Sequence, residues 1–326
     1  MLDVVSIGSA TLDIFLKSDQ FKIDWHESGV YLCEKYEGKI DAQELVMVSG
    51  GGATNSAVSF VKNGFQAAPI IEMGKDPASE TILSELERGG VDLSFVVQEE
   101  SETTAVSVIL LSGMGGNSIV TYRGASRMLT VNDIPFDKLG MILKPGGWIY
   151  LTSAGGDMEL VEKVLAWGKE KGRKAFWNPG AAELHAIQNS EFRIQNYKID
   201  VLQLNRQEAT EFFGVNFVDD EVWKAEHCPT SPETILLITD GENGGRVCLP
   251  AKTAKLSAGH HGSCLWYKGI KTKMIDSTGA GDAFGSGFVV GQIKGKTIEE
   301  SIEFGKRQAA NVVKFIGAKK GLIQLV

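Results

Sequence analysis

The sequence reads Asp276-Ser277-Thr278-Gly279-Ala280-Gly281-Asp282-Ala283-Phe284 near its C-terminus. These small residues predict an irregular turn that leads directly into a helix. The backbone N–H groups of such a turn can converge on an anion, and the helix N-terminus adds partial positive charge. Asp282 would lie beside that anion, where a carboxylate can accept the proton of an attacking hydroxyl. The alternative is an Asp-capped, glycine-rich connection of the kind common in α/β proteins.

A second glycine-rich stretch reads Ser49-Gly50-Gly51-Gly52-Ala53-Thr54-Asn55-Ser56-Ala57. Together the two stretches resemble the two signatures of the ribokinase-like (PfkB-type) carbohydrate kinase family. The first signature is filled by Gly51, Gly52, Ala53, Asn55, Ala57, Gly64 and Gly74. The second signature is filled by Asp276, Gly279, Ala280, Gly281, Asp282, Ser286 and Gly287. Two long signatures in the right order make the resemblance specific.

The resemblance implies an ATP-dependent phosphotransferase that moves the γ-phosphate to the hydroxymethyl group of a small sugar. Asp282 would be the base, and the backbone of Gly279, Ala280 and Gly281 would hold the charge of the transferring group. The expected sugar is of the ribokinase, fructokinase or ketodeoxygluconate kinase type. A nucleoside kinase of the adenosine type is the alternative. A catalytically idle sugar-binding regulator is less favoured, because binding alone needs no base.

The predicted sugar site lies just beyond the first strand, where ligands of open α/β sheets bind. Asp13 follows that strand, and the resemblance implies that its carboxylate takes hydrogen bonds from two sugar hydroxyls. The other substrate-binding residues that the resemblance implies are Thr11, Gly51, Gly52, Asn55 and Arg123. Thr11 stands where ribokinases usually have Asn, and no glutamate follows Leu151, which puts ribose itself in doubt. Asp13 as a turn cap and Arg123 as a solvent-facing residue are alternatives.

Motifs further along the chain resemble the nucleotide and metal sites of the family. The implied nucleotide-binding residues are Asn205, Thr239, Gly241, Gly244, Gly281 and Asn311. Glu208 would hold Mg²⁺ through water, since Mg²⁺ keeps much of its hydration shell. Residues implied for a K⁺ site, as in many relatives, are Asp276, Thr278, Val312 and Gly317. The alternatives are an ordinary capping box at Asn205 and Glu208 and a simple hairpin turn after Thr239.

The composition favours a cytoplasmic enzyme with a large buried core. The chain has 326 residues, of which 43% are hydrophobic and 23% are charged. A formal net charge of −8 argues against nucleic acid as the main partner. The pair Lys319-Lys320 is too short to indicate a basic patch. No apolar run reaches the roughly 18 residues of a membrane span, and the spacing of the four cysteines predicts reduced thiols.

Short apolar runs alternate with stretches of helical periodicity, which predicts a three-layer α/β/α fold with a mostly parallel central sheet. The expected strands cover residues 4–7, 68–73, 148–151, 175–177, 201–204 and 235–238. The expected helices cover residues 53–63, 79–88, 157–171, 206–213, 281–293 and 298–315. We expect a single domain over residues 1–326.

Residues 18–48 and 104–125 interrupt this alternation and predict a small projecting β-sheet, which the resemblance implies is a lid over the substrate. The alternative is an extra edge hairpin without that role. Aliphatic and aromatic side chains such as Val30, Tyr31 and Val108 predict an apolar outer face on this sheet. Such a face favours a homodimer joined through the lids.

Overall fold

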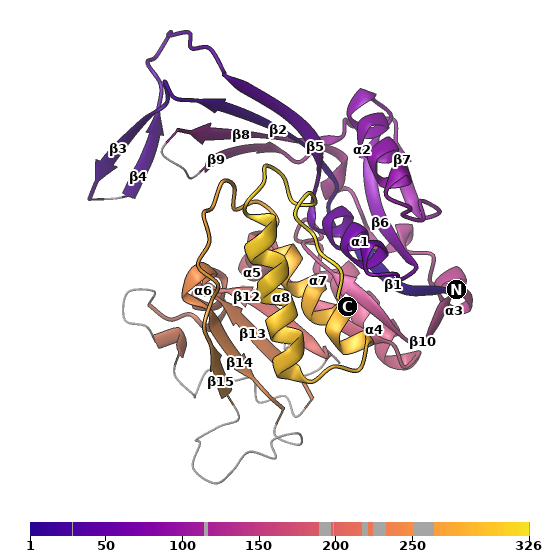
Figure 1. Ribbon diagram of the computed structural model, residues 1–326. Coiled ribbons are helices and arrows are strands. Elements are labelled where there is room, and N and C mark those ends of the chain that lie inside the picture. Colours follow the sequence, from indigo (N-terminus) through magenta and orange to yellow (C-terminus); the bar gives the residue numbers. More distant parts are fainter. Residues whose placement is uncertain are drawn as a thin grey trace.

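A nine-stranded sheet forms the centre of the computed structural model, which describes residues 1–27, 29–113, 117–188, 197, 199–216, 221–223, 233–250 and 264–325 (Figure 1). Its strands are β1 (Leu2–Ile7), β6 (Ala67–Gly74), β7 (Val96–Glu99), β10 (Leu143–Leu151), β11 (Lys174–Trp177), β12 (Val201–Asn205), β13 (Ile235–Thr239), β14 (Gly245–Cys248) and β15 (Cys264–Tyr267). Their order is β15-β14-β13-β12-β11-β10-β1-β6-β7. All neighbours are parallel except at the β13-β14-β15 edge.

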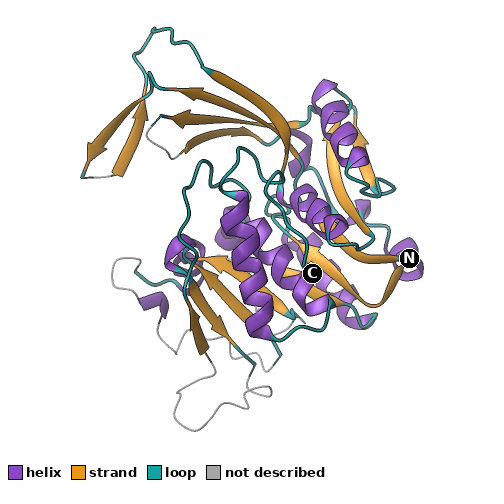
Figure 2. Cartoon of the chain, in the orientation of Figure 1, coloured by secondary structure: helices purple, strands orange, loops and turns teal. Residues whose placement is uncertain are grey.

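Helices cover both faces of this sheet (Figure 2). They are α1 (Gly52–Lys62), α2 (Pro77–Arg88), α3 (Phe136–Ile142), α4 (Met158–Glu170), α5 (Ala181–Gln188), α6 (Arg206–Phe213), α7 (Ala280–Ile293) and α8 (Ile298–Val312). Side chains of α1, α7 and α8 pack on one face, and those of α3, α4, α5 and α6 on the other. This arrangement confirms the predicted three-layer α/β/α fold. The helix expected over residues 298–315 ends at Val312, because the chain then turns back and the Val313 carbonyl accepts from the N–H of Ile275 at 2.7 Å.

Helix α7 lies very close to the sheet. Gly285 has no room for a side chain, since a Cβ there would lie 2.5 Å from the Tyr150 hydroxyl and 2.6 Å from the ring of Phe176. The rings of Tyr150 and Phe176 are stacked, with centroids 4.1 Å apart. Near the carboxyl end of β12, Gln203 Nε2 donates to the Gly281 carbonyl at 3.0 Å. The first turn of α7 is thereby fixed beside the carboxyl ends of the central strands.

A second sheet of four strands projects from this body (Figure 1). Its strands are β2 (Thr11–Ser18), β5 (Glu44–Gly50), β8 (Ala105–Ser112) and β9 (Asn117–Tyr122), in the order β5-β2-β8-β9. A separate hairpin contains β3 (Lys22–His26) and β4 (Gly29–Cys33). We expected Asp13 just beyond the first strand, and it lies there within the next strand, β2, which pairs with β5 and β8, so the alternative of a turn cap is wrong.

Strand β1 is the point where the order of the central sheet reverses. From β1 the sheet grows through β6 to β7 on one side and through β10 on the other. Such a reversal leaves a crevice at the carboxyl ends of the two strands, where α/β proteins bind ligands. Only residues 8–10 connect β1 to β2, so this crevice opens where the projecting sheet joins the body.

The structure also bears on the cysteine prediction. Cys33 and Cys248 carry thiols, whereas Cys264 is disulfide-bonded, so the prediction of reduced thiols is wrong for Cys264. Cys228 lies outside the described residues. Among the helices that are described, none is long and apolar enough to cross a membrane.

Candidate active site

The first turn of α7 leaves open space beside its backbone. Its N-cap Gly279 has φ 74°, and a Cβ there would lie 2.2 Å from the Cβ of Ala318, so only glycine fits. No side chain in the described part of the chain caps this helix. A Cβ at Gly281 would meet nothing closer than Gln203 Nε2 at 3.7 Å. Packing therefore does not require glycine at 281, and the open space adjoins N–H groups that a first helical turn leaves without partners.

Asp282 lies in this turn and is held by a residue of the other signature. Asn55 Nδ2 donates a hydrogen bond to Asp282 Oδ2 at 2.8 Å. Desolvation raises the pKa of the Asp282 carboxyl above its usual range, and the charge of Asp13 adds to this, whereas the Asn55 bond and the charge of Lys319 oppose it. A carboxylate with a raised pKa is a better proton acceptor. The fold thus joins the two glycine-rich stretches at one carboxylate.

Asp13 is the second carboxylate of the site. It lies on β2, is only 4% exposed, and accepts a hydrogen bond from Thr11 Oγ1 at 2.8 Å. Burial raises the pKa of Asp13, while the bonds from Thr11 and Ser107 and the charge of Lys319 lower it. A Cβ at Gly50 would lie 1.9 Å from Asp13 Oδ2, so this glycine leaves the space that the carboxylate occupies.

Lys319 is the candidate residue that the sequence patterns missed. Its Nζ donates to the carbonyl and Oγ of Ser49 and to Thr54 Oγ1, the last two at 2.7 and 3.1 Å. Desolvation lowers the pKa of this ammonium to about 8. The carboxylates that oppose this shift are Glu85, Asp13 and Asp282. The pair Lys319-Lys320 does not indicate in the sequence that Lys319 lies beside two carboxylates. That position arises only when the C-terminal loop packs against β5 and α1.

The turn that opens α1 packs directly on the carboxyl ends of β1 and β10. Gly51 has φ 92°, and a Cβ there would lie 2.5 Å from the Ser9 carbonyl oxygen. A Cβ at Gly52 would lie 2.8 Å from the side chain of Thr152. Both predicted glycines are therefore required by contacts within the protein, and these contacts bring Asn55 to the crevice beside β1.

A small cavity of about 50 Å³ lies at this crevice. Hydroxyl and guanidinium groups dominate its lining, which consists of Ser9, Thr11, Ala105, Thr121, Arg123, Ser126, Arg127, Ser153 and Gly155. Arg127 Nη2 lies 3.7 Å from Glu102 Oε2, whereas Arg123 forms no ion pair with any described residue. Two of the predicted substrate-binding residues, Thr11 and Arg123, are thus brought together.

The loop after β10 is shaped by a buried glutamate that we did not predict. Glu183 at the start of α5 accepts hydrogen bonds from the N–H groups of Ala154, Gly156 and Gly180 at 2.6, 2.9 and 2.8 Å. Its oxygens are engaged by the backbone, so this side chain shapes the loop instead of facing the cavity.

The predicted nucleotide-binding residues Asn205 and Thr239 lie side by side at the carboxyl ends of β12 and β13. Asn205 and Glu208 form a capping box, with Glu208 N–H donating to Asn205 Oδ1 at 2.9 Å and Asn205 N–H donating to Glu208 Oε2 at 2.8 Å. Desolvation raises the pKa of Glu208, and the charge of Asp282 adds to the effect. Gly241 and Gly244, with φ 54° and 104°, turn the chain from β13 into β14. The two structural alternatives, a capping box at Asn205 and Glu208 and a hairpin turn after Thr239, are therefore both present.

Asp276 ties three segments together. Its Oδ1 accepts hydrogen bonds from the N–H and Oγ1 of Thr278 at 3.0 and 2.7 Å and from Asn117 Nδ2 of β9 at 3.2 Å. Its Oδ2 accepts from the N–H of Gly317 at 3.0 Å. The carboxylate thereby connects the turn before α7, the C-terminal loop and the projecting sheet.

The two predicted site residues of α8 are engaged within the chain. Val312 is fully buried, and its carbonyl accepts from the N–H of Phe315 at 3.0 Å. Asn311 Nδ2 donates to the Gly321 carbonyl at 2.6 Å. Asn311 therefore anchors the C-terminal loop, and no hydrogen bond among the described residues connects it to Thr239 or Gly241.

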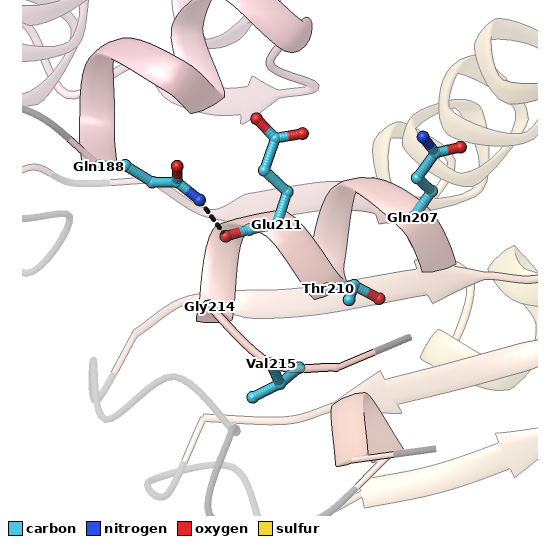
Figure 3. Close-up of a pocket in the computed structure, with 6 residues that line it drawn as sticks. All are labelled: Gln188, Gln207, Thr210, Glu211, Gly214 and Val215. Atoms are coloured by element: carbon cyan, nitrogen blue, oxygen red, sulfur yellow. Dashed lines mark hydrogen bonds between the residues drawn. The ribbon is translucent and has the colours of Figure 1, made fainter. Parts of the chain in front are cut away.

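A larger cavity of about 620 Å³ lies beside α6 (Figure 3). It is lined by Gln188, Gln207, Thr210, Glu211, Gly214 and Val215. Gln188 Nε2 donates to the Glu211 carbonyl at 2.5 Å and closes one side. None of the predicted site residues lines this cavity, which lies apart from the α7 turn and the β1–β10 crevice.

Comparison with known proteins identifies the family of this chain. A model of the pfkB family carbohydrate kinases matches residues 1–324. The chain belongs to this family. It is therefore an ATP-dependent carbohydrate kinase, a transferase with an alcohol group as acceptor, which confirms the predicted enzyme class.

The relatives of this chain are named for different phosphate acceptors. The chain is 25% identical over 285 residues to ribokinase from Haemophilus influenzae, which covers 87% of each protein. It is 26% identical over 303 residues to adenosine kinase from Saccharomyces cerevisiae, which covers 86% of this chain and 82% of that protein. The solved structure of Arabidopsis thaliana ribokinase complexed with ribose and ATP has a TM-score of 0.69 and 20% identity, covering 97% of this chain and 94% of that one. This structural likeness confirms the ribokinase-like fold.

Proposed function

We propose that this family member phosphorylates the hydroxymethyl group of a small sugar with Asp282 as the base. The observation that carries the proposal is the hydrogen bond from Asn55 to Asp282. It holds a carboxylate of raised pKa next to the open first turn of α7. A positioned base beside an anion-binding helix N-terminus is the arrangement that phosphoryl transfer to an alcohol needs.

The sugar would be held by Asp13 and Asn55. Asp13 is a buried acceptor that suits sugar hydroxyls. Asn55 Oδ1 is buried and has no hydrogen-bond partner in the described structure. An unsatisfied buried acceptor costs about 1–3 kcal/mol, so a sugar hydroxyl donating to Asn55 Oδ1 would remove a cost that the unliganded site carries.

In the proposed step, the hydroxymethyl oxygen attacks the γ-phosphorus and the new O–P bond forms. The bond from that phosphorus to the bridging oxygen breaks and ADP leaves with the electron pair. The hydroxyl proton passes to Asp282. Backbone N–H groups at Gly281 and Asp282 would hold the negative charge of the transferring group. The projecting sheet is proposed to cover the sugar and exclude water, which competes as an acceptor.

Mg²⁺ is the metal that we propose for the phosphates. Glu208 adds carboxylate charge near the predicted phosphates, and Mg²⁺ bound there through water would neutralise charge on the β- and γ-phosphates. The Asp276 carboxylate already accepts four hydrogen bonds from Thr278, Asn117 and Gly317, so it is not open to K⁺. We therefore derive no step through K⁺.

An assay of sugar-dependent ADP release tests the proposal. Wild-type protein is supplied with Mg-ATP and, one at a time, pentoses, hexoses, 2-keto-3-deoxygluconate and nucleosides. We expect turnover with a sugar, and we expect Arg123→Ala to raise the sugar KM without changing the ATP KM. Turnover with a nucleoside alone would favour the adenosine-type alternative. If none of these acceptors stimulated ADP release, the catalytically idle sugar-binding regulator would be the better interpretation.

We make three further proposals, on the location of the protein, its substrates and its assembly. Dependence on ATP favours a cytoplasmic location, and the net charge of −8 favours small-molecule substrates over nucleic acid. We also propose a homodimer joined through the projecting sheet.

A further inference from the structure

The ammonium of Lys319 is fixed at the junction of three segments. Its Nζ donates to the Ser49 carbonyl and Ser49 Oγ, at the end of β5, and to Thr54 Oγ1, in the first turns of α1. An ammonium has three protons, and here three oxygen atoms accept them. The positive charge of Lys319 is therefore held in one position. Its partner Thr54 directly precedes Asn55, the residue that donates a hydrogen bond to the proposed base Asp282.

Carboxylates surround this ammonium from different elements. Asp13 of β2, Asp282 of α7 and Glu85 of α2 all interact with its charge. Glu85 is engaged by the backbone, because its Oε2 accepts from the N–H of Ser49 at 2.7 Å. Asp13 and Asp282 are the two carboxylates that the proposed function needs in the ionised state.

Two carboxylates in one desolvated site oppose each other's ionisation. The charge of Asp13 acts against ionisation of Asp282, and the charge of Lys319 favours it. The other titratable groups that interact with Asp282 are Tyr150 of β10 and Glu208 of α6. Neither of these supplies a positive charge at neutral pH.

We infer that Lys319 is a positioning residue whose fixed ammonium allows Asp13 and Asp282 to be negatively charged together, so that one binds the sugar while the other accepts its proton. This inference rests on the proposed function and goes beyond it by assigning a role to a residue outside both signatures. The competing role is purely structural, with Lys319 only tying the C-terminal loop to β5 and α1.

The pH dependence of kcat/KM separates the two roles. Lys319→Met removes the charge and keeps the apolar stem, and Lys320→Met is the matched control, because Lys320 is exposed and its Nζ lies over the ring of Phe315 at 5.6 Å. For Lys319→Met we expect the acidic limb of the profile to move up by about one pH unit, which lowers kcat/KM by up to about tenfold on that limb. Above pH 8 we expect activity within about threefold of wild type. Lys320→Met should keep the wild-type profile.

An equal loss of activity at all pH values, together with a lower Tm, would assign Lys319 the structural role and overturn the inference. An unchanged acidic limb in Lys319→Met would overturn it as well. The Asp282 carboxyl is also titrated directly by NMR on protein labelled with ¹³C-aspartate, with Asp282→Asn to assign its signal. A higher pKa of that carboxyl in Lys319→Met supports the inference even if no acceptor is turned over, and an unchanged pKa overturns it. Failure of the proposed function is thus distinguished from failure of this inference.

Discussion

Replacement of Asp282 by Asn tests the base while keeping its shape. The Asn55 Nδ2 donor can still bond to the side-chain oxygen of an asparagine at 282. We expect kcat to fall by about 10²-fold or more, because the proton acceptor is lost. The KM for ATP should stay within about threefold of wild type, because only the acceptor's proton is affected. A variant that kept a tenth of the wild-type kcat would show that another group is the base.

Two glycines of α7 form a matched pair for testing the anion site. At Gly281 the nearest atom to an added Cβ is 3.7 Å away, whereas at Gly285 the added Cβ would lie 2.5 Å from both Gln203 Oε1 and the Tyr150 hydroxyl. We therefore expect Gly281→Ala to keep the wild-type Tm and lose phosphoryl transfer, because the methyl group occupies the space of the anion. Gly285→Ala should instead lower Tm by several degrees, as overpacking does. If Gly281→Ala were fully active, the anion would have to bind elsewhere.

Within strand β6, Glu72 is a buried carboxyl that the function does not use. It is 4% exposed, and its Oε2 has no hydrogen-bond partner among the described residues. Desolvation raises the pKa of Glu72 from 4.5 to about 7, with smaller contributions from Asp133 and Glu99. Between these pH values the folded chain keeps a proton that the unfolded chain has lost. The contribution of Glu72 to stability is therefore complete below pH 4.5 and is lost as pH rises to 7.

Glu72→Gln removes this titration with little change of shape. We expect Tm at pH 8 to rise by at least about 2 °C, and Tm at pH 4.5 to stay the same. Differential scanning calorimetry at both pH values measures the effect, and exposed Glu87→Gln on α2 is the control. A similar change of Tm at both pH values would mean that the substitution acts through packing and not through the charge.

Local sequence patterns predicted many of the helices and strands. Apolar runs gave the central strands, and two glycine-rich turns led to Asn55 and Asp282, because each signal is contained in a few neighbouring residues. Strand β2 was missed because only residues 8–10 separate it from β1, too few for the sequence to show where one strand ends and the next begins. Lys319 was missed because its partners Ser49 and Thr54 are distant in the sequence. Glu183 was missed for the same reason, since it bonds to the backbone of residues 154–156.

The projecting sheet presents an apolar outer face. Its exposed residues lie on β5 and β9: Leu45 at 60%, Met47 at 47%, Val120 at 67% and Tyr122 at 53%. The strand register places them on one face with Ile14 and Leu16 of β2. Contiguous apolar surface of this kind is typical of a protein interface, which supports the proposed homodimer.

Light scattering at low micromolar concentration measures the assembly. We expect twice the 35.2 kDa mass of one chain for the wild type and the mass of one chain for Val120→Asp. Met141→Asp on α3 is the control, because Met141 is 72% exposed and lies away from the projecting sheet. The same mass for both variants, or a monomeric wild type, would remove the dimer from the proposal.

The short connection between β1 and β2 has a thermodynamic consequence. Residues 8–10 join a strand of the rigid body to the strand that carries Asp13, and β2 is hydrogen-bonded along its length to β5 and β8. A sugar bound to Asp13 would therefore restrain the whole projecting sheet. Amide hydrogen exchange in β8 and β9 should slow when sugar binds, even at residues that do not touch it. Part of the contact energy is then used to reduce the conformational entropy of that sheet, so the measured sugar affinity is weaker than the contacts alone would give.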